Sequence, residues 1–126
     1  MILGIGIDII EIDRIKKSVD TFGEKFLDKI YTKTELDYSM PKANKYQHLA
    51  ARFAAKEAIY KALSSDTNEI YSWQDVEIFN EPNGLPKVKF YGPLKDYLND
   101  EKELRISMSH SENYVTCVAI LSSLKG

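Results

Sequence analysis

The stretch A-R-F-A-A-K-E-A-I-Y-K-A-L, residues 51–63, predicts a helix, because alanine and leucine dominate it and it contains neither glycine nor proline. We place the whole helix at about residues 45–64, beyond the proline that precedes it. The charged residues Lys56, Glu57 and Lys61 lie among its apolar residues. The central question of the sequence is whether these charges are solvated or take part in function.

The two long faces of this helix differ in character. An apolar stripe is expected to pack into a core, and Lys56 lies inside it. On an adjacent face Glu57 and Lys61 lie one helical turn apart, beside small alanines. Small residues let another backbone approach closely. The apolar stripe comprises Leu49, Phe53, Ile59, Tyr60 and Leu63.

The first strand, predicted at residues 2–8, offers a complementary surface. Gly4 and Gly6 alternate with the isoleucines and leave the face that carries Asp8 almost bare, and we expect Leu3, Ile5 and Ile7 to be buried on the other face. If the alanines dock on the glycines, Asp8 and Glu57 converge. Two converging carboxylates repel unless a proton or a cation joins them.

Oxygen ligands that are few in number favour Mg²⁺, completed by water and substrate phosphate. Lys61 would then be placed to hold a further phosphate oxygen. A structural alternative stays open at this point. Glu57 and Lys61 also form an ordinary surface pair, and Asp8 is also suited to cap the helix that follows it.

The remaining pattern predicts one α+β domain over residues 1–126, a compact sandwich of helices against one face of a largely antiparallel sheet. Tyr114 to Leu121 is apolar on both faces and is expected to be a central strand. Thr32 and Glu35 form a capping-box pattern. Strands are further expected at Trp73–Asn80, Lys87–Tyr91 and Leu104–Met108, and helices around Ile12–Phe22, Phe26–Ile30 and Gly92–Leu98.

Composition excludes several classes of protein. A net charge of −2 argues against a general nucleic-acid binder. The segment Pro41 to Ala62 nevertheless has five basic residues and one acid, which suits a phosphate-bearing ligand or an acidic partner. The single cysteine, Cys117, excludes an internal disulfide. No leader or membrane-spanning run is recognised, so we expect a cytoplasmic protein without membrane contact.

Two separated motifs resemble those of the bacterial holo-acyl-carrier-protein synthases, a family of 4′-phosphopantetheinyl transferases. G-I-D-I-I-E-I-D-R, residues 6–14, is similar to the first motif, and R-F-A-A-K-E-A-I-Y-K-A, residues 52–62, to the second. The resemblance continues through W-Q-D-V-E-I, N-G-L-P and I-S-M-S-H-S and covers essentially the whole chain.

The resemblance implies a specific reaction. The family transfers 4′-phosphopantetheine from coenzyme A to a serine of apo-acyl carrier protein, uses Mg²⁺, releases 3′,5′-ADP and supports fatty acid biosynthesis. It implies the 4′-phosphopantetheinyl transferase fold and a homotrimer with active sites between subunits. Asp8 and Glu57 match the metal-binding acids, and Lys61 matches a lysine near the phosphates. Arg14 and Arg52 match basic positions associated with the carrier or the coenzyme.

Three further residues are candidates by the same resemblance. His110 is expected in the active site, although its alternation with Met108 also suits a hydrogen-bonded core histidine. Gly84 and Pro86, in the N-G-L-P turn, are expected to line the adenine pocket of a neighbouring subunit. The acceptor of the serine proton stays open between Glu57 and a metal-bound water.

One departure from the family concerns the turn after the second motif. The family commonly has a glycine there, close to the coenzyme phosphates, whereas this chain has Ser64 and Ser65. The backbone is then less able to approach the coenzyme.

The sequence disfavours three rival interpretations. An RNA-binding module is disfavoured by the acidic pI of about 5.7. A dinucleotide-binding turn at G-I-G-I-D lacks its third glycine. A catalytically silent paralogue that binds the carrier as a structural partner is disfavoured because Asp8, Glu57 and Lys61 are all retained.

Overall fold

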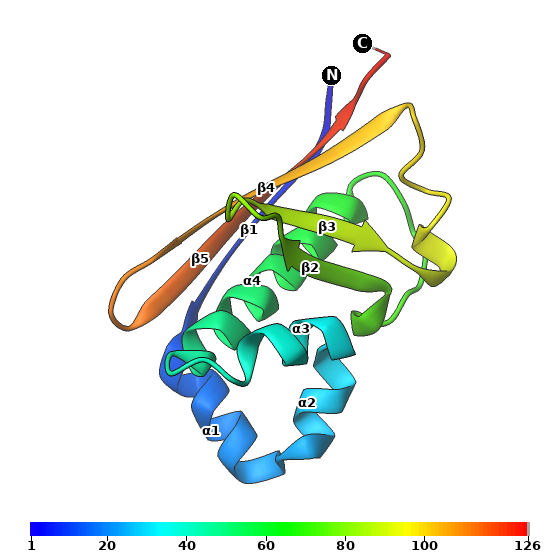
Figure 1. Ribbon diagram of the computed structural model, residues 1–126. Coiled ribbons are helices and arrows are strands. Elements are labelled where there is room, and N and C mark those ends of the chain that lie inside the picture. Colours follow the sequence, from blue (N-terminus) through cyan, green and yellow to red (C-terminus); the bar gives the residue numbers. More distant parts are fainter. Residues whose placement is uncertain (126) are drawn as a thin grey trace.

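The long helix that the sequence predicts lies in the middle of the molecule. In the computed structural model, which describes residues 1–125, this helix is α4 and spans Lys45–Ser64. It packs on a sheet along one side and is flanked by a hairpin and by three shorter helices (Figure 1). The helix is therefore buried on most of its sides and not only along one stripe. Tyr60, which was expected in the buried stripe, is 60% exposed.

An antiparallel sheet carries the two ends of the chain. It contains β1 (Ile2–Glu11), β4 (Lys102–His110) and β5 (Tyr114–Ser123) in the order β1-β5-β4. The strand predicted to be central from its apolar character, β5, is the middle strand. The chain termini consequently lie side by side (Figure 1).

The other elements surround α4 and complete the predicted α+β fold. The capping box begins α3 as predicted, because the amide of Glu35 donates to Thr32 Oγ1 and the amide of Thr32 donates to Glu35 Oε1. Strands β2 and β3 form a separate antiparallel hairpin. The bounds are α1 Ile12–Phe22, α2 Glu24–Ile30, α3 Lys33–Ser39, the 3-10 helix η1 Trp73–Asp75, β2 Val76–Asn80, β3 Pro86–Phe90 and the 3-10 helix η2 Gly92–Leu94.

Several predicted boundaries were wrong. The strand expected at residues 2–8 extends to Glu11, and the helix expected at Gly92–Leu98 is only the 3-10 turn Gly92–Leu94. The strand expected from Trp73 begins only at Val76, because residues Trp73–Asp75 form a tight 3-10 turn. The strand expected at Lys87–Tyr91 lies one residue earlier, at Pro86–Phe90. Among residues 1–125, no helix combines the length and the hydropathy that a membrane crossing requires.

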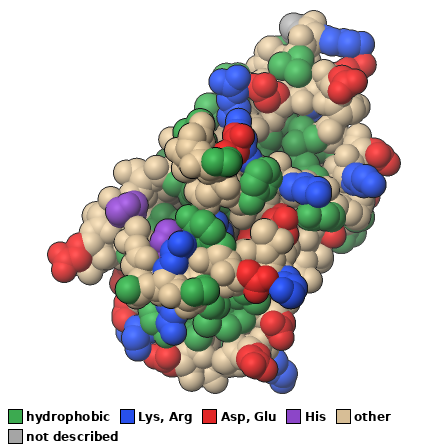
Figure 2. All heavy atoms as spheres, in the orientation of Figure 1, with side chains coloured by type: hydrophobic (Ala, Val, Ile, Leu, Met, Phe, Trp, Pro, Cys, Tyr) green, Lys and Arg blue, Asp and Glu red, His purple; other side chains and the backbone are tan. Residues whose placement is uncertain are grey.

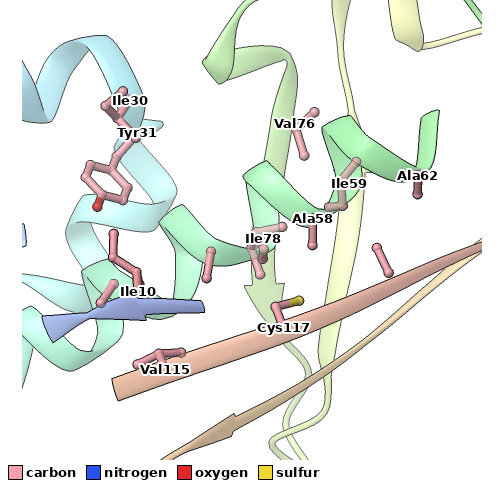
Figure 3. Packing of buried hydrophobic residues seen from close by; sticks show 14 of the residues in the cluster. Ile10, Ile30, Tyr31, Ala58, Ile59, Ala62, Val76, Ile78, Val115 and Cys117 are labelled. Atoms are coloured by element: carbon pink, nitrogen blue, oxygen red, sulfur yellow. The ribbon is translucent and has the colours of Figure 1, made fainter. Parts of the chain in front are cut away.

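The predicted docking of alanines on glycines is present between α4 and β1. A Cβ atom added to Gly6 would lie 1.8 Å from the carbonyl oxygen of Ala58, and one added to Gly4 would lie 2.0 Å from that of Ala62. Both are backbone clashes, so only glycine fits. Figure 3 shows the core around this contact, with Ala58 and Ala62 on the side of α4 that faces the sheet.

The opposite face of β1 differs from the prediction. Ile5, Ile7 and Ile9 are 57%, 62% and 66% exposed, although the first two were expected to be buried. The sequence prediction was wrong about which face of the strand packs in the chain: α4 covers the glycine face and leaves the isoleucine face open.

Candidate active site

Docking of α4 on β1 brings Asp8 to the helix. Asp8 follows Gly6 on the covered face of β1, and its side chain is only 18% exposed. Lys61 Nζ lies 3.3 Å from Asp8 Oδ1 and donates a 2.9 Å hydrogen bond to the carbonyl oxygen of Ile7. Thr116 Oγ1, on the central strand, donates to the backbone oxygen of Asp8 and holds this part of β1 in place.

Glu57 lies within electrostatic reach of both residues. Partial burial and the neighbouring charge of Asp8 raise the pKa of Glu57, and Lys61 lowers it again. The Glu57 carboxylate is therefore destabilised first by burial and then by the second carboxylate, and one lysine compensates in part. We call Asp8, Glu57 and Lys61 the carboxylate site. The structure brings these three sequence-predicted residues together from two elements that are far apart in the chain.

The third charged residue of the helix has a different role. Lys56 is 3% exposed and lies 2.7 Å from Oε1 of the fully buried Glu35. Its ammonium also donates to the carbonyl oxygens of Ile30 and Trp73, at 2.8 and 2.9 Å. Burial lowers the pKa of Lys56 and Glu35 raises it. Lys56 is therefore neither solvated nor part of the carboxylate site, and it ties α2, α3 and η1 to α4.

A cavity of about 250 Å³ adjoins the carboxylate site, because Glu57 is part of its wall. Its other side chains come from the end of α4 and from the segment that leads into β2. We call it the aromatic cavity. It is lined by Lys56, Glu57, Tyr60, Tyr71, Ser72, Trp73 and Val76.

A second group of sequence-predicted residues meets elsewhere. Arg52, Gly84, Pro86 and His110 line one groove of about 450 Å³ between α4, the β2–β3 turn and β4. The predicted turn forms at Gly84, whose φ of 88° requires glycine or a similarly tolerant residue. We call this surface the basic groove. Figure 2 shows the chain's only two histidines close together on this side of the molecule.

Arg52 is the most constrained residue of the basic groove. It is 2% exposed, its guanidinium carbon lies 4.5 Å from the centre of the Tyr38 ring, and its Nη2 donates a 2.8 Å hydrogen bond to Asn80 Oδ1. Asn80 Nδ2 in turn donates to the carbonyl oxygen of Gly84 at 3.1 Å. Within residues 1–125, Arg52 Nε is buried and has no hydrogen-bond partner. The guanidinium is thus held without an adjacent carboxylate bonded to it.

The positions of the two histidines decide between the alternatives for His110 and add His48 to the groove. His110 is exposed at the end of β4, so the alternative of a hydrogen-bonded core histidine is wrong. His48, for which the sequence suggested no role, lines the same groove. Burial lowers the pKa of His48, and the neighbouring positive charges of Arg52, Lys42 and His110 act in the same direction.

Sequence reasoning also missed Asn80 and Tyr71. Asn80 is the last residue of β2, and its contact with Arg52 joins residues 28 positions apart, which no local pattern signals. Tyr71 lies in the irregular segment before η1. The only available signal was that both residues flank the recognised W-Q-D-V-E-I motif.

Arg14 lies apart from both groups. It is exposed on α1, where Lys16 and Lys17 pair with Asp20 and Asp13. Within residues 1–125, Arg14 makes no ion pair. At the departure noted in the sequence, Ser64 Oγ donates to the carbonyl oxygen of Lys61 at 2.9 Å, so this hydroxyl is engaged by its own helix.

Comparison with known proteins gives a consistent result. Residues 4–119 match the sequence model of the 4′-phosphopantetheinyl transferase superfamily. A holo-[acyl-carrier-protein] synthase of Protochlamydia amoebophila is 46% identical over 123 residues, which cover 98% of this chain and all of that protein. The crystal structure of holo-[acyl-carrier-protein] synthase from Neisseria meningitidis has a TM-score of 0.85 and 33% identity, covering 98% and 100% of the two chains. The Helicobacter pylori enzyme in complex with coenzyme A has a TM-score of 0.79 and 33% identity, covering 94% and 99%.

Proposed function

Because the chain belongs to the 4′-phosphopantetheinyl transferase superfamily and, within it, to the holo-[acyl-carrier-protein] synthases, we propose that it transfers 4′-phosphopantetheine from coenzyme A to a serine of apo-acyl carrier protein. The serine oxygen forms a bond to the β-phosphorus, and the bond from that phosphorus to the bridging oxygen breaks. The products are holo-carrier and 3′,5′-ADP. In a cell this step would take place in the cytoplasm and support fatty acid biosynthesis. The meeting of Asp8, Glu57 and Lys61 carries the proposal.

The chemistry of the carboxylate site fits Mg²⁺. Asp8 and Glu57 are two hard oxygen donors, and burial together with the charge of Asp8 raises the pKa of Glu57. No group of three or more metal-ligating side chains occurs within residues 1–125, so Asp8 and Glu57 would leave positions for water and phosphate oxygens. When bound, the ion supplies neutralisation of the pyrophosphate charge.

Lys61 and Glu57 have further roles in this mechanism. Lys61 supplies the positive charge that faces Asp8 in the chain alone, and with the coenzyme present it stabilises the negative charge on the leaving 3′,5′-ADP. Glu57 is our candidate acceptor of the serine proton, because as a metal ligand its carboxylate would lie beside the reacting phosphate. Phosphoryl transfer otherwise depends on positioning and charge neutralisation.

The basic groove suits the nucleotide end of the coenzyme. Arg52, His48 and His110 offer positive or protonatable groups, and Gly84 and Pro86 add an apolar edge. This groove does not face the carboxylate site of its own chain. Arg52 and Lys61 are nine residues apart on α4, which places them on opposite sides of the helix and about 13.5 Å apart along its axis.

A homotrimer with shared active sites resolves this separation, because the carboxylate site of one subunit can then face the basic groove of the next. The exposed face of the sheet supports such an assembly. Ile5, Ile7 and Ile9 are exposed on β1, and Ile5 and Ile7 lie opposite Ile120 and Val118 on β5. An apolar sheet face of this kind is typical of an interface between copies. Arg14, exposed without an ion pair on α1 in the described chain, is proposed to contact the acidic carrier.

The reaction is tested by mass spectrometry of apo-acyl carrier protein after incubation with coenzyme A and the purified chain. We expect the carrier to gain one phosphopantetheine group when Mg²⁺ is present and none when it is chelated. The Asp8→Asn variant should abolish the gain. The exposed ion-pair variant Asp37→Asn, on α3, is the matched control and should retain it. Carrier binding without any mass gain would instead support the silent paralogue.

A further inference from the structure

Residues 65–71 connect α4 to the start of η1 and lie next to the carboxylate site. We call them the connecting segment. Its last residue, Tyr71, lines the aromatic cavity together with Glu57. Tyr71 and Tyr60 also line a second cavity of about 280 Å³, and most of the remaining wall of that cavity is the connecting segment itself. The position of the segment therefore determines the shape of the space beside Glu57.

Few contacts hold the connecting segment in place. The amides of Asp66 and Thr67 donate to the carbonyl oxygen of Leu63, both at 2.9 Å, and so bind the segment to the end of α4. Within residues 1–125, every hydrogen bond and ion pair that joins the segment to a part of the chain beyond α4 involves the Asp66 carboxylate. A segment with so few contacts opens readily when its one distant anchor is removed.

Two side chains bind the Asp66 carboxylate. The hydroxyl of Tyr97 donates to Asp66 Oδ2, and Lys102 Nζ lies 3.1 Å from the same oxygen. The ammonium of Lys102 also lies 3.9 Å from the centre of the Tyr97 ring, within the range of a cation–π contact. We call these three residues the latch. It joins the loop after α4 to the segment between η2 and β4 (Figure 1).

The latch is better protected from water than the exposed ion pairs of the protein. The side chains of Asp66 and Lys102 are 24% and 26% exposed, whereas those of the pairs on α1 and α3 are at least 50% exposed. The hydrogen bonds from Tyr97 and Lys102 lower the pKa of Asp66, with Tyr97 the larger cause, so the carboxylate is charged at neutral pH. Hydrogen bonds to a charged acceptor are stronger than neutral ones.

The partners of Asp66 are themselves fixed to the body of the protein. Lys102 is the first residue of β4 and lies opposite Ser123 on the central strand β5. The amide of Tyr97 donates to the carbonyl oxygen of the fully buried Leu94. The latch therefore holds the connecting segment against parts of the fold that do not depend on that segment.

We propose that Asp66 is a positioning residue for the transfer reaction, because the latch holds the connecting segment where coenzyme A requires it. A wall that is in place before binding lowers the entropic cost of binding. The proposal rests on the proposed function, because it takes coenzyme A as the substrate. It also gives a role to the turn after the second motif, where Ser64 and Ser65 depart from the family. In this chain the turn is fixed by side-chain contacts of the residue that follows them.

Steady-state kinetics measure the effect of the latch on binding. Asp66→Asn should raise the KM for coenzyme A about 5-fold, because binding must then order the connecting segment, and should change kcat less than about twofold. Lys102→Arg keeps a cation at the latch and should keep the KM. The matched control is Lys125→Met, which breaks an exposed ion pair with Glu101 close to the latch and should leave the KM unchanged.

The residues of the latch should act as a unit. Lys102→Met alone should raise the KM in the same direction as Asp66→Asn. The double variant should raise it no further than the more affected single variant, because the first substitution has already released the segment. Effects that multiply in the double variant would mean that the two residues act independently, which contradicts a latch.

Hydrogen exchange of backbone amides tests the positioning without any turnover. In the free chain, Asp66→Asn should speed exchange in the connecting segment and leave exchange in β1 unchanged. Saturating coenzyme A should return the segment to the exchange rate of the wild-type complex. Faster exchange throughout the chain would mean that Asp66 only stabilises the fold and would overturn the proposal. An unchanged KM, or a fall in kcat without a rise in KM, would overturn it as well.

The two proposals fail separately. A chain that transfers nothing to the carrier, but whose connecting segment shows the latch-dependent exchange and its reversal by coenzyme A, contradicts the reaction and leaves the latch intact. A chain that transfers phosphopantetheine with the same KM in the wild type and in Asp66→Asn contradicts the latch alone.

Discussion

At the scale of single residues, Asn80 has a role that depends on its being neutral. It accepts a hydrogen bond from Arg52 and donates one to the carbonyl oxygen of Gly84, so it fixes the guanidinium against the turn. An aspartate would accept the same bond from Arg52 but would cancel its charge. Asn80 therefore keeps the positive charge of Arg52 available to an anion.

We predict that Asn80→Asp raises the KM for coenzyme A about tenfold, which corresponds to ~1.4 kcal/mol, with a smaller effect on kcat. Steady-state kinetics at several coenzyme concentrations would measure this. Asn83→Asp, in the same turn, is the control and should change KM little, because the Asn83 side chain accepts from the amide of Leu85 and does not contact Arg52 within residues 1–125. An unchanged KM in Asn80→Asp would contradict the assignment of the nucleotide end of the coenzyme to the basic groove.

Ionised Glu57 is expected to lower the free energy of unfolding of the metal-free protein at neutral pH. Its pKa in the folded chain is raised by burial and by Asp8, so the folded state resists ionisation that the unfolded state permits. This penalty is absent below the ordinary pKa of glutamate, where Glu57 is protonated in both states, and appears as pH rises through that value towards the raised pKa.

Without metal, Glu57→Gln should therefore raise Tm by ~2 °C at pH 7 and leave Tm unchanged near pH 4. The same substitution should abolish transfer activity. The exposed Glu69→Gln should shift Tm at neither pH. Thermal unfolding in chelator at both pH values measures the difference. A Tm at pH 7 that is unchanged or lowered in Glu57→Gln contradicts the strain we assign to the carboxylate site.

Whether the sequence predicts the role of a residue depends on whether a local pattern marks the surfaces that bring it to its partners. Asp8, Glu57 and Lys61 were predicted together because glycines and alanines mark both docking surfaces in the sequence. The hydrogen-bond partner of Arg52, Asn80, was not predicted, because this contact follows from how the β2 hairpin lies on α4. The structural role of Lys56 was not predicted, because its partner Glu35 was interpreted only as a capping residue.

At the scale of elements, the contact between β1 and α4 has no room for a side chain. A Cβ atom at position 6 would lie 1.8 Å from a backbone oxygen of α4, so Gly6→Ala must displace the helix. We predict a loss of about 3 kcal/mol or more in the free energy of unfolding, measured in urea. Because the clash is with backbone, the second substitution Ala58→Gly should not rescue it. Rescue by Ala58→Gly would show that the contact is between side chains.

The buried ion pair between Lys56 and Glu35 joins four elements. Removing one partner leaves a buried charge uncompensated, so Lys56→Met should destabilise the fold by about 3–5 kcal/mol. Lys33→Met breaks an exposed pair with Asp37 and should cost less than about 0.5 kcal/mol. Chemical unfolding of the two variants side by side gives the comparison. Equal losses would mean that Lys56 contributes as little as a surface charge.

Elements with a strong local signal were predicted well. Helix α4 has the bounds that its alanines suggest, and β5 is central because it is apolar on both faces. The start of β2 was predicted wrongly, because a 3-10 turn at Trp73–Asp75 depends on contacts with α2 and α4 rather than on residue pattern.

At the scale of the whole molecule, the main surprise is the exposed isoleucine face of β1. Alternation predicted that these residues would be buried, and in the chain alone they are not. Sequence periodicity reports that a face is apolar and does not report whether the same chain covers it. The proposed trimer accounts for this face and for the separation of the basic groove from the carboxylate site.

Shared active sites imply that two inactive chains can complement each other. Asp8→Asn damages the carboxylate site, and Arg52→Met damages the basic groove while keeping an apolar stem. In trimers refolded from an equal mixture, each interface takes its carboxylate site from one subunit and its basic groove from the next. The carboxylate site is intact in half of the interfaces and the groove in half, so a quarter of the interfaces have both intact.

Transfer activity of this mixture is the measurement that tests the account most directly. We predict roughly a quarter of wild-type activity, although each variant alone is nearly inactive. A mixture of Asp8→Asn with Glu57→Gln, which both damage the carboxylate site, should recover nothing. If the Asp8→Asn and Arg52→Met mixture stays as inactive as its parts, the active site does not lie between subunits and the account is contradicted.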